Sequence, residues 1–469
     1  MSVSGALNTA VSGLDAQSAA LATISNNVAN SQTVGYKEID TNFVNYLTVS
    51  NAAVDGAASV VAKPYYANDF QGSVTQSSDP TSLAVSGQGF FAVQKQTGIV
   101  SGVTTYDPLQ YYTRAGDFTA DSGGKLVNSA GYTLDGYLAT TSAATGVVTF
   151  NRSALVPIVI DKAPSPPVAT TTMTLAANLP ATPPVGATTF SSTQQVYDPE
   201  GNAQNITSTW TQVTPGSDPA SNQYTLTITA PGSSGNGASA VGVTPVVPAT
   251  IGPLTVTFGT GATGTGAPAP AGTILSIVPA TAATGAPVVS SNTGASPTTA
   301  TPATIGMTLN YGTGAQTITL GLGNYQSTNG VTQFAGTTYQ VAGQTANGLP
   351  QGNYSSVAIN AQGNVEVNYD NGAISTIATV PLATFPSPDS LQSQDGQAFT
   401  QSLNSGSANL VVAGTDGSGT LATNSVEGSN VDIAGQFTNM IVAQRAYEAN
   451  AKMITTAATL LQTVIQMVQ

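Results

Sequence analysis

The chain has 469 residues, a net charge of -13 with only nine Lys and Arg, and neither Cys nor His. Its length predicts two to four domains, and the absence of Cys excludes disulfides and thiolate metal sites. Without His, the commonest general base and zinc ligand are missing, so we expect no catalytic, metal or cofactor site. The scarcity of basic residues argues against nucleic acid and anionic membranes as partners.

Residues 1–36 have the spacing of a long helix with a heptad seam. The larger apolar residues of this seam are Val3, Leu7, Leu14, Leu21, Ile24 and Val28. The segment has no Lys or Arg with which a secretory signal peptide would begin, and no part of the chain approaches 18 uninterrupted apolar residues. We therefore expect no cleaved signal peptide and no membrane insertion.

An aromatic-rich connector follows at residues 37–76. Its aromatic residues include Phe43, Tyr46, Tyr65, Tyr66 and Phe70. Because aromatic residues are common anchors of protein interfaces, this composition favours contacts with neighbouring subunits. Packing against the chain's own domain is an alternative of at least equal weight for each residue taken singly.

Two β-rich segments, residues 77–165 and 352–427, are predicted to form one middle domain. In the first, short strands such as 90–93 and 132–138 are separated by Gly-rich turns. In the second, apolar and polar residues alternate on both sides of Asn371-Gly372, which is a strong hairpin signal. Two half-sheets that are distant in sequence would then complete one domain.

Residues 166–351 are predicted to form a β-rich outer domain inserted between these segments, with a further subdomain at about 233–305. Residues 219–365 contain no Asp, Glu, Lys or Arg. Runs such as 223–230 and 316–322 alternate apolar and polar residues and are rich in Val, Ile and Thr. This pattern favours strands over disorder, because disordered segments are usually charged and poor in β-branched residues.

The last segment, residues 428–469, predicts a second long helix with two apolar stripes. The first stripe includes Phe437, Met440, Tyr447, Ile454, Leu461, Ile465 and Val468, and the second includes Met453, Leu460 and Val464. Since one partner helix cannot cover both stripes, we expect the ends to be poorly ordered in an isolated monomer and to become helical when several subunits pack together. Packing of either helix on its own domain is the alternative.

The predicted fold class is therefore mainly β with terminal α-helices. The N- and C-terminal helices, residues 1–36 and 428–469, pair in a coiled-coil-like inner domain. The β-rich middle and outer domains are nested between them, so that the inner and middle domains are each discontinuous in sequence.

Both ends of the chain also carry motifs of a known family. Residues 7–37 include the Ser12-Gly13-Leu14 step, the Asn26-Asn27 pair and the Val34 to Lys37 exit, and this segment resembles the N-terminal signature of bacterial flagellar rod and hook proteins. Residues 427–452, with the Gln444 to Asn450 stretch, are similar to the other end of the same family. Similarity at both ends makes a chance match improbable.

The middle of the chain separates hook proteins from rod proteins. Residues 112–118 resemble both kinds, whereas Val196 to Asn202 resembles the start of the outer domain in hook proteins and precedes a large insertion. The resemblance thus implies a structural subunit of the flagellar hook. Such a subunit polymerises into a curved, flexible tube that joins rod to filament, transmits torque as a universal joint and encloses the export channel.

The same resemblance implies partners and a location. The chain would form a homopolymer of many copies and would meet the distal rod protein, the hook cap, the hook-filament junction proteins and the flagellar export apparatus. It would be exported without a cleaved signal to the extracellular hook of the flagellum. The seam residues of both terminal helices would then be polymerisation contacts, and the aromatic connector would touch neighbouring subunits.

Two other classes of protein remain open. A secreted β-rich adhesin or passenger-type surface protein is the stronger rival. A glycosidase is the enzymatic alternative, because paired carboxylates need no His. The available acids are Glu366, Asp370, Asp198 and Glu200, and none is near the aromatic cluster expected of a sugar cleft, Trp210 being the only Trp.

Overall fold

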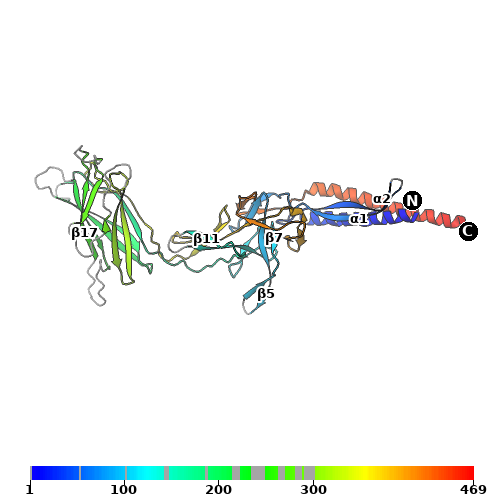
Figure 1. Ribbon diagram of the computed structural model, residues 1–469, viewed down its shortest axis with the longest axis horizontal. Coiled ribbons are helices and arrows are strands. Elements are labelled where there is room, and N and C mark those ends of the chain that lie inside the picture. The colour runs from blue at the N-terminus through cyan, green and yellow to red at the C-terminus, as the bar shows by residue number, and fades with distance from the viewer. Residues whose placement is uncertain are drawn as a thin grey trace. The chain divides into compact units, whose positions relative to one another are not determined.

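The computed structural model describes residues 3–51, 54–100, 103–141, 147–184, 188–213, 222–233, 249–261, 270–279, 288–289 and 301–468. The chain forms two compact units (Figure 1). Unit 1 consists of Met1–Lys162, Ser355–Asn368 and Ile374–Gln469, and unit 2 consists of Ala163–Tyr354 and Tyr369–Ala373. Much of the subdomain predicted at about 233–305 lies outside the described residues. The domain boundaries predicted from the sequence stay a prediction.

Unit 1 contains both terminal helices, α1 (Val3–Ala29) and α2 (Ile433–Val468). They lie side by side and antiparallel (Figure 1), since Asn27 bonds Gln436 at one end and Gly13 faces Asn450 further along. Neither helix contains Pro, and both are rich in Ala, the strongest helix former. As far as the chain is described, no helix is both long and apolar enough to cross a membrane.

The connector forms a long antiparallel hairpin, a structure not anticipated from its sequence. Strand β1 (Ile39–Asn51) pairs with β2 (Val54–Tyr66), starting from the pair Ile39 and Tyr66. The hairpin lies along α1, where the Val60 amide donates to the Ser12 hydroxyl at 3.2 Å. The helical pair therefore carries a β-ribbon of the same chain on one side.

The rest of unit 1 is a β body. Its strands are β3 (Val74–Gln76), β4 (Leu83–Ser86), β5 (Phe90–Val100), β6 (Val103–Tyr106), β7 (Tyr111–Thr113), β8 (Thr119–Ala120), β9 (Leu126–Val127), β10 (Tyr132–Thr141), β11 (Val148–Phe150), β12 (Val156–Pro157), β23 (Tyr354–Ile359), β24 (Asn364–Tyr369), β25 (Ile374–Thr379), β26 (Leu382–Thr384), β27 (Gln392–Gln394), β28 (Ala398–Thr400), β29 (Asn409–Val411), β30 (Thr420–Thr423) and β31 (Ser425–Glu427), with a 3-10 turn η1 (Pro388–Ser390).

Fifteen of the described strands form one sheet, with β23-β24-β25-β10-β5-β7-β28-β27 as its main path. Segments before and after the inserted unit thus share one sheet, because β10 pairs with β25 and β5 pairs with β26. The body packs around aromatic residues, and Phe90 meets Phe399 edge to face at 5.8 Å. Two shorter pairs, β3 with β31 and β4 with β30, lead toward the helical pair.

Unit 2 is built from two five-stranded sheets. Its strands are β13 (Thr172–Asn178), β14 (Thr189–Tyr197), β15 (Ala203–Gln212), β16 (Gln223–Ala230), β17 (Ala249–Phe258), β18 (Ile274–Pro279), β19 (Val288–Val289), β20 (Pro302–Asn310), β21 (Ala315–Asn324) and β22 (Gln340–Ala346). One sheet has the order β14-β15-β16-β17-β18 and the other β19-β20-β21-β13-β22. Strands β17 and β18, which fall in the range of the predicted subdomain, extend the first of these sheets.

The core of unit 2 is large and apolar. Alternate residues point inward, so Ile206 and Trp210 of β15 and Leu226 and Ile228 of β16 are buried while the intervening Thr residues face outward. Both sheets contribute to this core, which makes unit 2 a sandwich. Mainly β structure with terminal helices and a nested order of units confirms the predicted fold class.

Candidate functional site: the helical pair and its junction with the β body

The most buried positions of the two terminal helices are mostly small or amide residues. On α1 the most buried positions are Ala10, Ala16, Ala20, Ile24 and Asn27, and on α2 they are Gln436 and Ala443. At Gly13 an added Cβ would lie only 3.0 Å from the Asn450 side-chain amide nitrogen, so the helices approach closely there. Contacts between the two helices therefore include Gly13 with Asn450 and Asn27 with Gln436.

Several large apolar residues of α2 are exposed. The relative exposure is more than one half at Phe437, Ile441, Val442, Met453 and Leu460. Monomeric soluble proteins rarely leave such large apolar residues gathered on one element, and when they do the surface usually binds another protein. The outer surface of α2 is therefore equipped for a partner.

The predicted seam residues divide into three groups. Ile24 is buried, whereas Leu7, Leu14, Leu21, Val28, Met440 and Ile454 are half-buried. Phe437, Tyr447, Met453, Leu460 and Leu461 are exposed. The side chains of Val3, Val464, Ile465 and Val468 lie outside the described residues. Small residues rather than the larger apolar ones are thus the most buried, and the role of the larger ones between subunits stays a prediction.

The aromatic residues of the connector are mostly exposed. Phe43, Tyr46, Tyr65 and Phe70 present their rings to solvent, and Tyr66 is half-buried. Tyr65 is also fixed in place, because its hydroxyl donates to Asp389 Oδ2 at 3.1 Å. Their contacts with neighbouring subunits stay a prediction, but packing within the chain leaves most of these residues exposed.

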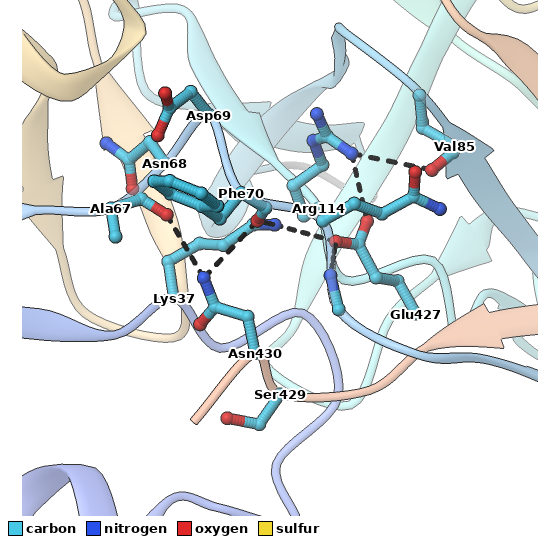
Figure 2. A network of polar contacts seen from close by, with 12 residues as sticks. Lys37, Ala67, Asn68, Asp69, Phe70, Val85, Arg114, Glu427, Ser429 and Asn430 are labelled. Atoms are coloured by element: carbon cyan, nitrogen blue, oxygen red, sulfur yellow. Dashed lines mark hydrogen bonds and ion pairs between the residues drawn. The ribbon is translucent and has the colours of Figure 1, made fainter. Parts of the chain in front are cut away.

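A buried ion triad, formed by Lys37, Arg114 and Glu427, lies where the helical pair meets the β body (Figure 2). Lys37 Nζ donates to Glu427 Oε1 at 2.6 Å and to the Phe70 carbonyl at 2.5 Å. Arg114 Nη1 donates to Glu427 Oε2 at 3.0 Å, and the Gly72 amide donates to Oε1 at 2.9 Å. The three side chains are at most 1% exposed. One carboxylate therefore joins four separate parts of the chain.

Arg114 ties the triad further into the β body. Its Nη2 donates to the Gly87 carbonyl at 2.8 Å, and its Nη1 also reaches the Val85 carbonyl at 3.4 Å. The guanidinium carbon lies 5.0 Å from the centre of the Phe90 ring, in the geometry of a cation–π contact. Arg114 is thus held from the side of the sheet as well as by Glu427.

Burial dominates the electrostatics of the two cations. It lowers the pKa of Lys37 below its ordinary value, although the Glu427 carboxylate opposes that change, and the nearby Arg114 adds to it. Burial also lowers the pKa of Arg114, again against the effect of Glu427. Two cations share one anion, so the loss of Glu427 would leave two like charges buried together.

Glycines let the backbone come close enough to build the triad. Gly35 has a positive φ of 69°, and an added Cβ would lie 2.3 Å from the Ala115 nitrogen. Its amide donates to the Glu427 carbonyl at 2.8 Å. A residue with a side chain would meet both backbone strain and steric overlap here.

Two amide side chains, the half-buried Asn430 and the buried Asn27, extend the junction toward the helices. Asn430 accepts from the Glu38 amide at 2.7 Å and donates to the carbonyls of Ala67 and Phe70 (Figure 2). Asn27 accepts from the Ile39 amide at 3.1 Å and donates to its carbonyl at 2.8 Å. These hydrogen bonds connect the end of α1 and the segment before α2 to the backbone at both ends of the connector hairpin.

Gln436 closes this network on α2. Its oxygen accepts from Asn27 Nδ2 at 3.3 Å, and its nitrogen donates to Glu38 Oε1 at 2.6 Å. The Tyr36 hydroxyl donates to Asn27 Oδ1 at 3.0 Å, and burial, with help from Glu38, raises the pKa of Tyr36 to about 12. The hydroxyl therefore remains a proton donor across the physiological pH range.

No local sequence pattern indicated the triad, because Lys37 and Glu427 are 390 residues apart. An indirect signal was present. Basic residues are scarce, and Lys37 lies in the exit of the N-terminal motif, Arg114 in residues 112–118, and Glu427 at the start of the C-terminal motif. Rare charges placed in three separate motifs are candidates for one buried cluster.

Of the acids considered for a glycosidase, Asp370 accepts hydrogen bonds from the amide and the side chain of Asn353. Trp210 is fully buried in the core of unit 2 and has no face available for a sugar. Asp198 is used within its own turn, where it accepts from the amides of Glu200 and Asn202. Among the described residues, no group of three or more acidic side chains is placed to hold a metal ion.

Known protein families match four parts of this chain. The flagella basal body rod protein family matches residues 7–37, and the C-terminal family of flagellar basal body rod FlgEFG proteins matches residues 422–467. The flagellar hook protein FlgE/F/G D1 domain matches residues 84–177, and the flagellar basal body protein FlaE D2 domain matches residues 160–349. Together with the paired terminal helices, these matches define the class of flagellar axial proteins.

Full-length relatives narrow this class. The chain is 30% identical to a flagellar hook protein FlgE of Rhizobium meliloti over 468 residues, covering all of both chains. It is 28% identical to that of Salmonella typhimurium, covering 98% of each. The crystal structure of Helicobacter pylori flagellar hook protein FlgE2 matches with a TM-score of 0.45 and 13% identity, covering 74% of this chain and 98% of that one. The chain belongs to the flagellar hook protein family, and these relatives give the adhesin alternative no support.

Proposed function

We propose that the helical pair is the polymerisation element of this hook subunit and that the ion triad couples it to the β body. The observation that carries the proposal is the exposed apolar surface of α2, which includes Phe437, Met453 and Leu460. Full burial of such a side chain stabilises by roughly 1.5–3 kcal/mol. Several of them on one helix supply enough free energy for strong contacts between copies, because they are left exposed within the single chain.

The ion triad gives this element a firm mechanical attachment. A subunit that transmits torque has to pass force from its helices to its β body without local slippage. Glu427 is bonded to Lys37, Arg114 and the Gly72 amide at 2.6–3.0 Å in a site closed to solvent. A buried cluster of this kind is screened far less by salt than surface ion pairs are. We therefore assign torque transmission within the subunit to this junction.

The composition of α1 suits the wall of an export channel. Asn8, Ser18, Ser25 and Asn26 are exposed, and Asp15 is the only charge in residues 1–36. A neutral polar wall binds a passing unfolded chain weakly. We assign the outward side of α1 to the channel, and the connector hairpin with Phe43 and Tyr46 to contacts with neighbouring subunits.

The family assignment also extends to partners and location. Self-polymerisation in the flagellar hook follows from the family. We further propose that the chain contacts the distal rod protein, the hook cap, the junction proteins and the export apparatus. Its proposed role is extracellular, structural and non-enzymatic. We also propose that the chain is organised into the predicted inner, connector, middle and outer domains.

The test replaces single apolar residues of the helical pair in the full chain. Leu461→Asp and Leu21→Asp are expected to abolish tube formation by the purified protein, as seen by electron microscopy. Leu461→Met, which keeps an apolar side chain of similar volume at the same position, is the matched control and should assemble. A urea-unfolding transition of Trp210 fluorescence that matches the wild type would show that unit 2 of each variant is folded. Normal tubes from both Leu→Asp variants would overturn the intersubunit seam.

A further inference from the structure

The turn at residues 401–406 displays one apolar side chain completely. Leu403 has a relative exposure of 103%, the largest among the exposed large apolar residues that the structure describes. An isolated exposed Leu is common on protein surfaces and would need no explanation by itself. The construction of the turn beneath it makes this Leu unusual.

Serine side chains hold this turn in one shape. The Ser402 hydroxyl accepts from the amides of Asn404 and Ser405 at 3.2 and 3.1 Å and donates to the Ser390 carbonyl at 2.6 Å. The Ser405 hydroxyl is buried, accepts from the Ser402 amide at 2.9 Å and donates to the Ser402 carbonyl at 2.9 Å. Polar loop tips are usually mobile, but this one is braced from within.

The turn is also anchored to the β body and to the connector. Phe399 and Leu391 fix the flanking strands in an aromatic core. The adjacent η1 carries Asp389, whose side chain accepts from the amides of Asn68 and Asp69 at the base of the connector hairpin. Leu403 is therefore presented by the same hydrogen-bonded framework that positions the exposed connector.

We propose that Leu403 is a preformed contact residue that inserts into a neighbouring copy of this chain in the assembled hook. The inference rests on the self-polymerisation of the hook family and adds a contact that lies outside the helical pair. Rigid presentation lowers the entropy lost on association, which is the main cost of using an exposed side chain as an anchor. Residues 396–415 contain no charge, so this segment adds no repulsion toward a second copy, whose net charge is also -13.

The absence of Cys allows a direct test on the full chain. The Leu403→Cys variant has a single thiol, at a fully exposed position where folding should be unaffected. In assembled tubes the rate of maleimide labelling should fall at least about tenfold relative to the monomer, as expected for a side chain buried in an interface. Depolymerising the same tubes should restore the monomer rate. A benzophenone attached to this thiol should yield a covalent dimer of the chain after irradiation of tubes, and none in the monomer.

The outcomes separate this inference from the proposed polymerisation element. If the thiol of the Leu403→Cys variant labels as fast in tubes as in the monomer, the contact is overturned while the helical seam is left intact. A photoproduct with a different protein would also overturn it, because the occupant would not be a second copy. If Leu403→Cys remains a folded monomer that cannot form tubes, the contact is supported, and Leu403→Met should then restore assembly.

Discussion

The two units of this chain are stabilised by different interactions. Unit 2 contains no Lys or Arg at all, so it cannot form a salt bridge within itself, and it depends on a large apolar core around Trp210. Unit 1 buries three charges at one junction and leaves large apolar residues of α2 exposed. Unit 2 thus has a complete core of its own, whereas unit 1 keeps apolar surface available for assembly.

Because of this difference, the two units should respond differently to substitution. A hydrophobic core tolerates substitutions that keep its volume, while a buried charge cluster fails when one member is missing. The contrast can be measured in one experiment, because Trp210 is the only Trp and reports on unit 2, whereas both long helices belong to unit 1. Fluorescence and helical circular dichroism therefore follow the two units separately during urea unfolding.

The largest effect is expected from Glu427→Ala. The change leaves Lys37 and Arg114 buried without a counter-ion, and breaking a buried ion pair in this way costs about 3–5 kcal/mol. Circular dichroism should show early unfolding of unit 1, with no change in the Trp210 transition. Glu448→Ala, at an exposed position on α2, is the control and should be neutral. Equal stability of the two variants would contradict the role of the triad.

A smaller loss is expected from Gly35→Ala. Positive φ for a residue with a side chain costs roughly 1–3 kcal/mol, and the overlap with Ala115 adds to this value. Gly131→Ala provides a matched comparison, because Gly131 also has positive φ but has nothing within 4 Å of an added Cβ. The difference between the two unfolding free energies measures the close approach itself. If both variants lose the same amount, packing at Gly35 is not tight.

A third prediction concerns pH and unit 1. Asp135 is fully buried, and burial raises its pKa to about 7, although hydrogen bonds from Gln110 and Gln94 oppose the change. Between about pH 4 and 7 the folded chain keeps a proton that the unfolded chain releases, so this group's contribution to stability is lost as pH rises through that window. Asp135→Asn should remove the slope and be more stable than the wild type at pH 8 by roughly 1–3 kcal/mol.

The measurement for Asp135 is the difference in unfolding free energy between variant and wild type at several pH values. Asp79→Asn, at an exposed position, serves as the comparison. A difference for Asp135→Asn that is independent of pH across the same window would rule out the raised pKa as its cause.

The smallest effect is expected from salt. Because unit 2 has no basic residue and residues 219–365 have no charge, its unfolding free energy should change by less than about 0.5 kcal/mol between low salt and roughly 1 M NaCl. Cryo-electron microscopy of tubes at both salt concentrations should likewise show the same outer contacts between subunits. If the outer domains separate at one of the two concentrations, charges outside this segment set the hook shape.

Local sequence patterns predicted the positions of the strands better than they predicted side-chain packing. The alternation at residues 223–230 corresponds to β16, and Asn371-Gly372 does connect β24 to β25. The heptad spacing located both helices, but it could not show that Ala10, Ala20 and Ala443 would be more buried than the larger apolar residues. Periodicity records which residues are apolar, whereas close approach depends on which residues are small.

Other features were hidden because they depend on distant parts of the chain. The connector hairpin contains Ala, Asp and Gly in β2, which weakens its strand signal, and its position is fixed by contacts with α1. The triad needs Lys37, Arg114 and Glu427 to come together from three segments. No local rule predicts such a site, and the only indirect signal is the scarcity of basic residues, which makes Lys37 and Arg114 candidates for a buried cluster.

The long separation of the triad residues has a consequence for the order of folding. Residues 163–354 are continuous in unit 2, so the sandwich can form from neighbouring segments, whereas the junction must close loops of 313 and 390 residues around Glu427. Closing long loops costs entropy before any contact forms, and non-local pairing is correspondingly slow. We expect the sandwich to fold first and the junction last, so that a subunit acquires its mechanical stiffness only when its C-terminal segment has arrived.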